Sequence, residues 1–173
     1  MVAGGAAFAL VVVLAASAAA AKTTARHAIA TPATLPLRTA ILDHLFEGQQ
    51  QESAFSMAQA AGATYVRLSA PWRSIAPATP GADFVAADPT SPGYSWSGLD
   101  SVMVDAAAAG ITPILDIVAP PQWGYAQQPK GVNAGTPDVA ALGDFATALA
   151  THYNGLTPGI PAEHVCQVWT SPI

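Results

Sequence analysis

Two periods of apolar and polar positions follow one another along the chain from residue 37 onwards. Short apolar and β-branched runs predict four strands, at 37–42, 64–69, 112–118 and 163–169. Segments with apolar residues at helical spacing predict three helices, at 49–61, 97–109 and 136–153. The predicted order is therefore β-α-β-α-β-α-β, which is typical of an α/β protein with a parallel sheet.

The connections between these elements are unequal in length. Gly62 and Gly110 close the first two helices and leave very short turns before the next strands. A loop with five prolines, 71–94, follows the second strand and is expected to hold no helix or strand. Thr136 is predicted as the N-cap of the third helix, with Pro137 at its first position.

Long loops after strands and short turns after helices are typical of a (β/α)8 TIM barrel. A doubly wound sheet would give the same order, but no G-x-G-x-x-G follows any predicted strand. A complete barrel needs about 250 residues. With four strands and three helices predicted in 173 residues, the expectation is the first half of a barrel, over residues 37–173.

The N-terminal 21 residues have the pattern of a secretory signal peptide. An apolar run at 6–14 precedes small residues that offer A-x-A cleavage sites, such as Ala16-Ser17-Ala18. The alternative is an uncleaved membrane anchor, and either one predicts a secreted or extracellular domain. Residues 22–36 are rich in Thr, Ala and Pro and are expected to be a flexible lead-in.

Composition excludes several classes of function. Apolar residues make up 51% of the chain, which excludes a disordered protein. Six Lys and Arg against eleven Asp and Glu give a net charge of −5, so non-specific nucleic-acid binding is excluded. A single cysteine and four scattered histidines predict no metal site, and no cofactor motif is present.

Arg67 is a charged residue in the middle of an apolar strand, and burying it alone would be costly. Two interpretations remain open. Arg67 forms a structural ion pair with Asp43 or Asp116, or it is a cleft cation that holds a catalytic carboxylate. Asp116 itself is followed by Ile117 and Val118, so it is expected to lie too deep for catalysis.

Three of the four tryptophans, Trp72, Trp123 and Trp169, come at or after the carboxyl end of a predicted strand. Aromatic rings there could stack on sugar rings or could pack the rim of the domain. Trp96 begins a helix and is expected in the core. Among the eleven carboxylates no two stand out as the acid and nucleophile that glycoside hydrolysis requires, and those on helices, Asp100 included, are expected on solvated faces.

Four segments together are similar to a known family. They are LRTAILD at 37–43, AAGATYVRLS at 60–69 with Pro71-Trp72, the residues Asp88-Pro89, Pro92, Tyr94 and Trp96, and APPQW at 119–123. In this order they resemble the N-terminal half of secreted bacterial cellulase-like glycoside hydrolases, (β/α)8 retaining enzymes close to families 5 and 39.

This resemblance implies a hydrolase acting on the O-glycosidic bonds of a β-linked polysaccharide or oligosaccharide by double displacement. It implies substrate-binding roles for Arg67, Trp72 and Trp123. In that family the fourth strand ends in W-N-E-P, whose Glu is the general acid/base. Here Thr170 and Ser171 follow Trp169, and a serine hydroxyl cannot titrate near neutral pH. The family's nucleophile strand comes later than residue 173, so the chain is expected to be inactive alone.

The departure at Thr170 suggests a hypothesis about the gene. The codons AAC-GAG-CCC-GAT encode Asn-Glu-Pro-Asp, and after deletion of one A they are read as ACG-AGC-CCG-AT, which encodes the Thr-Ser-Pro found here and begins the Ile codon. The alternative is an ordinary end of the gene. Two other functions stay open, namely a non-catalytic carbohydrate-binding or cell-surface module and a small membrane-anchored structural protein.

Overall fold

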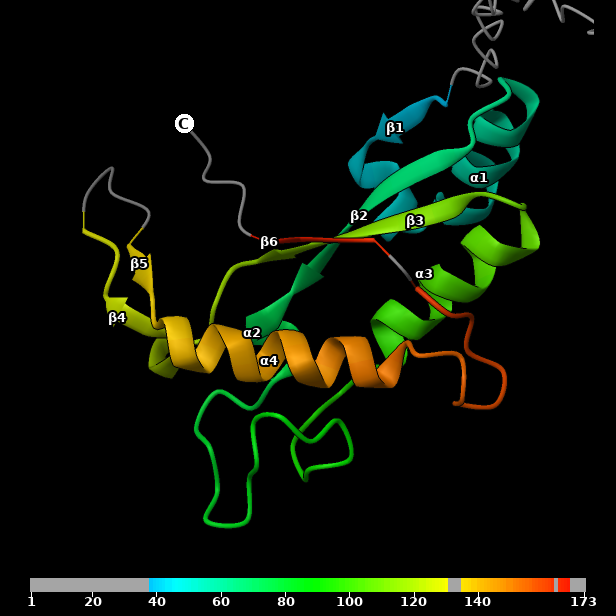
Figure 1. The fold of residues 1–173 in the computed structure, drawn as a ribbon. Helices are drawn as coiled ribbons and strands as arrows, with labels where there is room; N and C mark the ends of the chain where they lie inside the picture. Colours follow the sequence, from blue (N-terminus) through cyan, green and yellow to red (C-terminus); the bar gives the residue numbers. More distant parts are fainter. Residues whose placement is uncertain (1–37, 131–134, 164, 169–173) are drawn as a thin grey trace, which may run out of the picture. The chain divides into compact units, whose positions relative to one another are not determined.

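The computed structural model describes residues 38–130, 135–163 and 165–168, which include a four-stranded parallel sheet (Figure 1). The strands are β1 (Ala40–Leu42), β2 (Tyr65–Pro71), β3 (Thr112–Val118) and β6 (Cys166–Val168). All four lie within or overlap the ranges that the apolar pattern predicts. Their order in the sheet is β1-β2-β3-β6, so each strand lies beside the next one along the chain.

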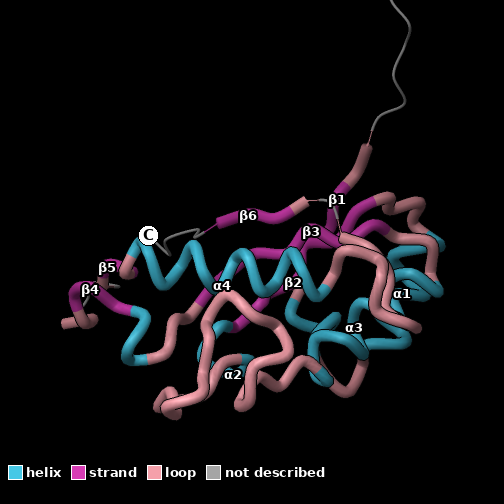
Figure 2. The backbone as a smooth tube through the Cα atoms, turned by 60° about the horizontal axis from the view of Figure 1, so that its bottom comes forward, coloured by secondary structure: helices cyan, strands magenta, loops and turns pink. Residues whose placement is uncertain are grey.

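Three helices connect these strands: α1 (Gln51–Ala60), α3 (Ser97–Ala108) and α4 (Val139–His152). Each predicted helix is therefore confirmed, with ends that differ by a few residues. Gly62 and Gly110 have φ angles of +75° and +68°, the left-handed conformation that ends a helix at glycine. Figure 2 shows the helices on one side of the sheet.

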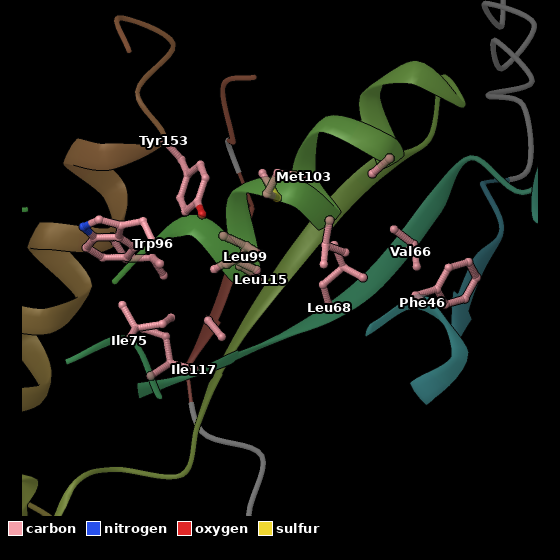
Figure 3. Packing of buried hydrophobic residues seen from close by; sticks show 14 of the residues in the cluster. Phe46, Val66, Leu68, Ile75, Trp96, Leu99, Met103, Leu115, Ile117 and Tyr153 are labelled. Atoms are coloured by element: carbon pink, nitrogen blue, oxygen red, sulfur yellow. The ribbon is translucent and has the colours of Figure 1, made fainter. Parts of the chain in front are cut away.

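The core forms between this side of the sheet and the helices. Every second residue of β2 and β3 is fully buried there, including Val66, Leu68, Leu115 and Ile117 (Figure 3). Phe55 of α1, Met103 of α3 and Phe145 of α4 belong to the same cluster. The apolar residues of the strands recur every two positions and those of the helices about every 3.6 positions, so both sets point into the same core layer between the sheet and the helices.

The opposite face of the sheet is only partly buried. Tyr65, Arg67 and Ser69 of β2 alternate with the core residues and have intermediate exposure. Leu42 of β1 is 62% exposed. The chain thus builds a sheet with one covered and one open face, and this open face carries the charged residues considered below.

Two predictions about the loops are wrong. Asp138, not Thr136, is the N-cap of α4, because its Oδ1 accepts a hydrogen bond from the Ala141 amide at 2.9 Å. Thr136–Pro137 instead form β5, which pairs in an antiparallel way with β4 (Tyr125–Gln127). The proline-rich segment was expected to hold no helix, but it contains a single helical turn, α2 (Trp72–Ile75). No proline lies between Pro71 and Pro77, so the residues between them can form one turn.

Two short 3₁₀ helices are also present: η1 (His44–Glu47) after β1 and η2 (Gln122–Gly124) after β3. No helix in the described ranges is long and apolar enough to cross a membrane. The predicted signal peptide and lead-in, residues 1–36, lie outside the described residues, as do Trp169, Thr170 and Ser171.

Candidate functional site

An ion pair between Arg67 and Asp116 occupies the open face of the sheet. Arg67 Nε donates to Asp116 Oδ2 at 3.1 Å, and Nη2 donates to the same oxygen. The side chain of Asp116 is 2% exposed and that of Arg67 is 28% exposed. Of the two partners that the sequence left open, Asp116 is the one observed. Asp43 instead caps η1 through the Leu45 amide.

The strand register explains why these two residues meet. Asp116 lies opposite Ser69, two residues beyond Arg67 on β2, and partners in a parallel sheet project to the same face. Gln167 of β6 lies opposite Asp116 on its other side. Mutual attraction and charge-assisted hydrogen bonds offset the cost of removing both charges from water. The expectation that Asp116 lies deep is confirmed.

Trp123 lies in η2, at the carboxyl end of β3, and remains partly exposed. Its Nε1 donates to the Pro77 carbonyl at 2.8 Å, and its ring meets Phe84 edge-on at 5.8 Å. Pro77 and Phe84 both belong to the long loop that follows β2. The hydrogen bond therefore fixes the indole orientation and joins the loops after β2 and β3.

Trp72 does not lie in an open cleft, contrary to the substrate-binding role that the family resemblance implies. The residue has no exposed surface. Its ring is stacked on Phe145 of α4 at 5.0 Å and meets Trp123 edge-on at 5.3 Å. The turn of α2 begins at Trp72 and directs this ring into the core. An indole covered on this scale cannot stack on a sugar in this structure.

Trp72 and Trp123 are part of a larger aromatic cluster at the carboxyl edge of the sheet, formed with Phe84, Tyr94, Trp96 and Phe145. Trp96 is 8% exposed, which confirms the expectation that it is a core residue. Tyr94 donates its hydroxyl to the Ala86 carbonyl. Burial, and then the carboxylates of Asp144 and Asp88, raise the pKa of Tyr94 to about 12.

A second polar cluster joins α3 to the end of α4. Asp100 Oδ1 accepts from the Tyr153 hydroxyl at 2.9 Å and lies 2.8 Å from His152 Nε2. The His152 ring is stacked on Trp96 at 4.5 Å. Burial and the neighbouring Asp100 carboxylate raise the pKa of Tyr153 above its ordinary range. Asp100 is therefore half-buried and bonded, and the prediction of a solvated helix face is wrong for it.

Glu47 is a residue that sequence reasoning did not single out. It ends η1, just after β1, and its Oε1 accepts from the Ser69 amide at 2.6 Å. This bond ties the first loop to the end of β2. It also places a carboxylate at a pocket of about 420 Å³ between η1, α2 and α3. The only sequence signal was position, since Glu47 follows a strand at its carboxyl end.

Ala119 marks the exit from β3. It has a φ of +51°, which is unusual for a residue with a Cβ, and its carbonyl accepts from the Arg73 amide at 2.9 Å. This bond connects the end of β3 to α2. Within the described ranges, no group of three His, Cys, Asp or Glu side chains could hold a metal ion.

The geometry defines the class of protein: an α/β domain whose parallel strands follow chain order, with aromatic loops at the carboxyl edge. No family model matches the chain, and no curated protein matches it. Among solved structures, a family 39 glycoside hydrolase from the gut symbiont Bacteroides cellulosilyticus WH2 is similar, with a TM-score of 0.45 and 18% identity. The match covers 79% of this chain and 25% of that enzyme, so the likeness is distant and partial.

Proposed function

We propose that this chain is part of a secreted glycoside hydrolase that binds a β-linked polysaccharide or oligosaccharide. The single observation that carries the proposal is the indole of Trp123. It is partly exposed at the carboxyl edge of a parallel sheet and fixed in orientation by its bond to Pro77. A fixed aromatic ring offers its face to the C–H face of a sugar at little cost in conformational entropy.

Two further features support a barrel of the (β/α)8 type. The strands β1, β2, β3 and β6 are adjacent in chain order, as in the wall of such a barrel. Their open face carries Arg67 and Asp116, as the polar interior end of a barrel wall would. In this proposal residues 37–173 supply the first four strands, and residues 1–21 direct export.

Catalysis would depend on residues other than those described. Hydrolysis with retention requires a general acid/base and a nucleophile, usually both carboxylates. Asp116 is engaged by Arg67, and Glu47 by the Ser69 amide. Ser171 stands where the resembling enzymes have their acid/base Glu, and its hydroxyl does not exchange a proton near neutral pH. We therefore propose that this chain binds glycan but does not hydrolyse it.

The experiment is affinity electrophoresis of the full chain through gels containing soluble β-glucan, xylan or mannan. We expect retardation by at least one glycan and no turnover of chromogenic β-glycosides. Trp123→Ala should reduce the affinity at least tenfold, whereas Trp123→Phe should retain part of it. Leu156→Ala is the matched control, because Leu156 is 83% exposed and lies after α4.

Lack of retardation in all three glycans, or equal retardation of Trp123→Ala and wild type, would refute the proposal. Retardation combined with turnover would refute only the claim of inactivity. Retardation without turnover also fits the alternative of a non-catalytic carbohydrate-binding module.

A further inference from the structure

We infer that the pocket between η1, α2 and α3 binds a single neutral sugar unit, as a subsite separate from Trp123. This inference rests on the proposed glycan-binding function and names a second place where the ligand is held. The pocket has a volume of about 420 Å³, within the range of about 300–1,000 Å³ common for small-molecule sites. Arg67, Trp72 and Trp123 do not line it.

The floor of the pocket is apolar and rigid. It is formed by Ile75 of α2 and by Leu99 and Val102 of α3, which are 3%, 7% and 6% exposed. Pro71 at the end of β2 continues this surface. Aliphatic side chains of this kind can cover the C–H face of a pyranose ring, and their fixed packing means that the pocket is formed before the ligand arrives.

The walls of the pocket supply hydroxyl groups. They come from four serines on three different segments: Ser69, Ser74, Ser95 and Ser97. The structure gives these hydroxyls no hydrogen-bond partner among the described residues, so all four can bond a ligand. A serine hydroxyl both donates and accepts, which matches the hydroxyl groups of a sugar better than any ion.

Glu47 sets the charge of the pocket. Its Oε1 is held by the Ser69 amide, so the carboxylate lies at a fixed place in the wall. Glu47 is the only charged side chain among the lining residues. A carboxylate accepts hydrogen bonds from sugar hydroxyls, and it repels a sugar that carries a carboxylate or sulfate. The ligand is therefore expected to be neutral.

Gly98 offers a way to close the pocket without disturbing the fold. It lines the pocket within the first turn of α3, and a Cβ added there meets no heavy atom within 4 Å. Gly143 of α4 is equally open and does not line the pocket. Gly98→Met and Gly143→Met therefore form a matched pair in which only one side chain competes with a ligand.

The test uses the full chain and saturation-transfer NMR with methyl β-D-glucopyranoside and methyl β-D-xylopyranoside as probes. We expect wild type and Gly143→Met to bind at least one probe, and Gly98→Met to bind it at least tenfold more weakly. Glucuronate should bind wild type more weakly than the neutral glucoside. Glu47→Gln, which keeps an oxygen acceptor for the Ser69 amide, should reduce that discrimination.

Equal binding by Gly98→Met and wild type would overturn the inference. So would absence of binding to both monosaccharide probes while oligosaccharide retardation through Trp123 persists, and in that case the proposed function would stand. Loss of both monosaccharide and oligosaccharide binding in wild type would overturn the inference and the proposed function together.

Discussion

Arg67 on β2 and Asp116 on β3 are bound to each other on the face of the sheet that the helices leave open. The pair lies between two strands whose other side chains, such as Leu68 and Leu115, face the apolar core. Arg67 therefore has a local electrostatic role in this structure, as the partner of a buried carboxylate. A buried carboxylate beside a partly exposed guanidinium is a feature that single substitutions can test.

We expect Asp116→Ala to lower the free energy of unfolding by about 2–3 kcal/mol, because it leaves Arg67 without the carboxylate that neutralises it. Breaking a fully buried pair costs about 3–5 kcal/mol, and the partial exposure of Arg67 reduces this figure. The double variant Arg67→Met/Asp116→Leu should lose less than Asp116→Ala, because no charge stays buried. Urea denaturation measures the free energy of unfolding of the single and the double variant. If Asp116→Ala is as stable as wild type, the ion pair does not stabilise the fold.

The contact between Gly124 and Trp72 gives a second prediction. A Cβ at position 124 would lie 2.8 Å from Trp72 Cη2, and the stack on Phe145 prevents the indole from moving away. Gly124→Ala should therefore destabilise the fold by about 1–3 kcal/mol, as overpacking commonly does. Gly143→Ala in the middle of α4 is the control and should stabilise the fold by about 0.5–1 kcal/mol. Thermal denaturation of both variants distinguishes the two directions, and equal melting temperatures would count against the close contact.

The four strands of the parallel sheet and the three longer helices were predictable from the sequence because their periods are clear. That they form half of a (β/α)8 barrel stays a prediction. Val66 and Leu68 alternate with polar residues in β2, and Gly62 and Gly110 end their helices in the left-handed conformation. These signals are local, so they identify these strands and helices without knowledge of the rest, whereas α2, β4 and β5 carry no such periodic signal. Asp138 and Thr136 are both good N-cap residues, and local preference could not decide between them.

The candidate site was predictable only in part, because side-chain direction depends on tertiary contacts. Trp72 and Trp123 both follow a strand, yet the turn of α2 buries one and η2 leaves the other partly exposed. The sequence left Asp43 and Asp116 as possible partners of Arg67, and the strand register places Asp116 beside it. The bonds from Asp100 to Tyr153 and from Glu47 to the Ser69 amide join residues far apart in the chain, so no local pattern predicts them.

Alkaline pH should destabilise the protein through Tyr153 and Tyr94. Both phenols have pKa values raised by burial, Tyr94 to about 12, so the folded state prefers them protonated. Their stabilising contribution is complete below the unfolded pKa of about 10 and is lost as the pH rises above it. Melting temperatures measured between about pH 8 and 11 should fall at the upper end of this range. The fall should be smaller in Tyr153→Phe, although this variant also loses the hydrogen bond to Asp100. An identical slope in wild type and Tyr153→Phe would contradict the role of Tyr153.

The start of α4 supplies the last prediction, which separates the observed cap from the one that the sequence suggested. Asp138 accepts from the Ala141 amide, whereas Thr136 lies in β5 opposite Gln127. Asp138→Ala should cost about 1 kcal/mol of stability, because an amide of the first turn loses its partner and a negative charge leaves the positive end of the helix dipole. Asp138→Asn should recover most of this loss, since an amide oxygen can also accept. Thr136→Ala should change the free energy of unfolding by less than about 0.5 kcal/mol, because Thr136 is exposed and does not cap α4. A larger loss for Thr136→Ala than for Asp138→Ala in urea denaturation would show that α4 begins where the sequence alone suggested.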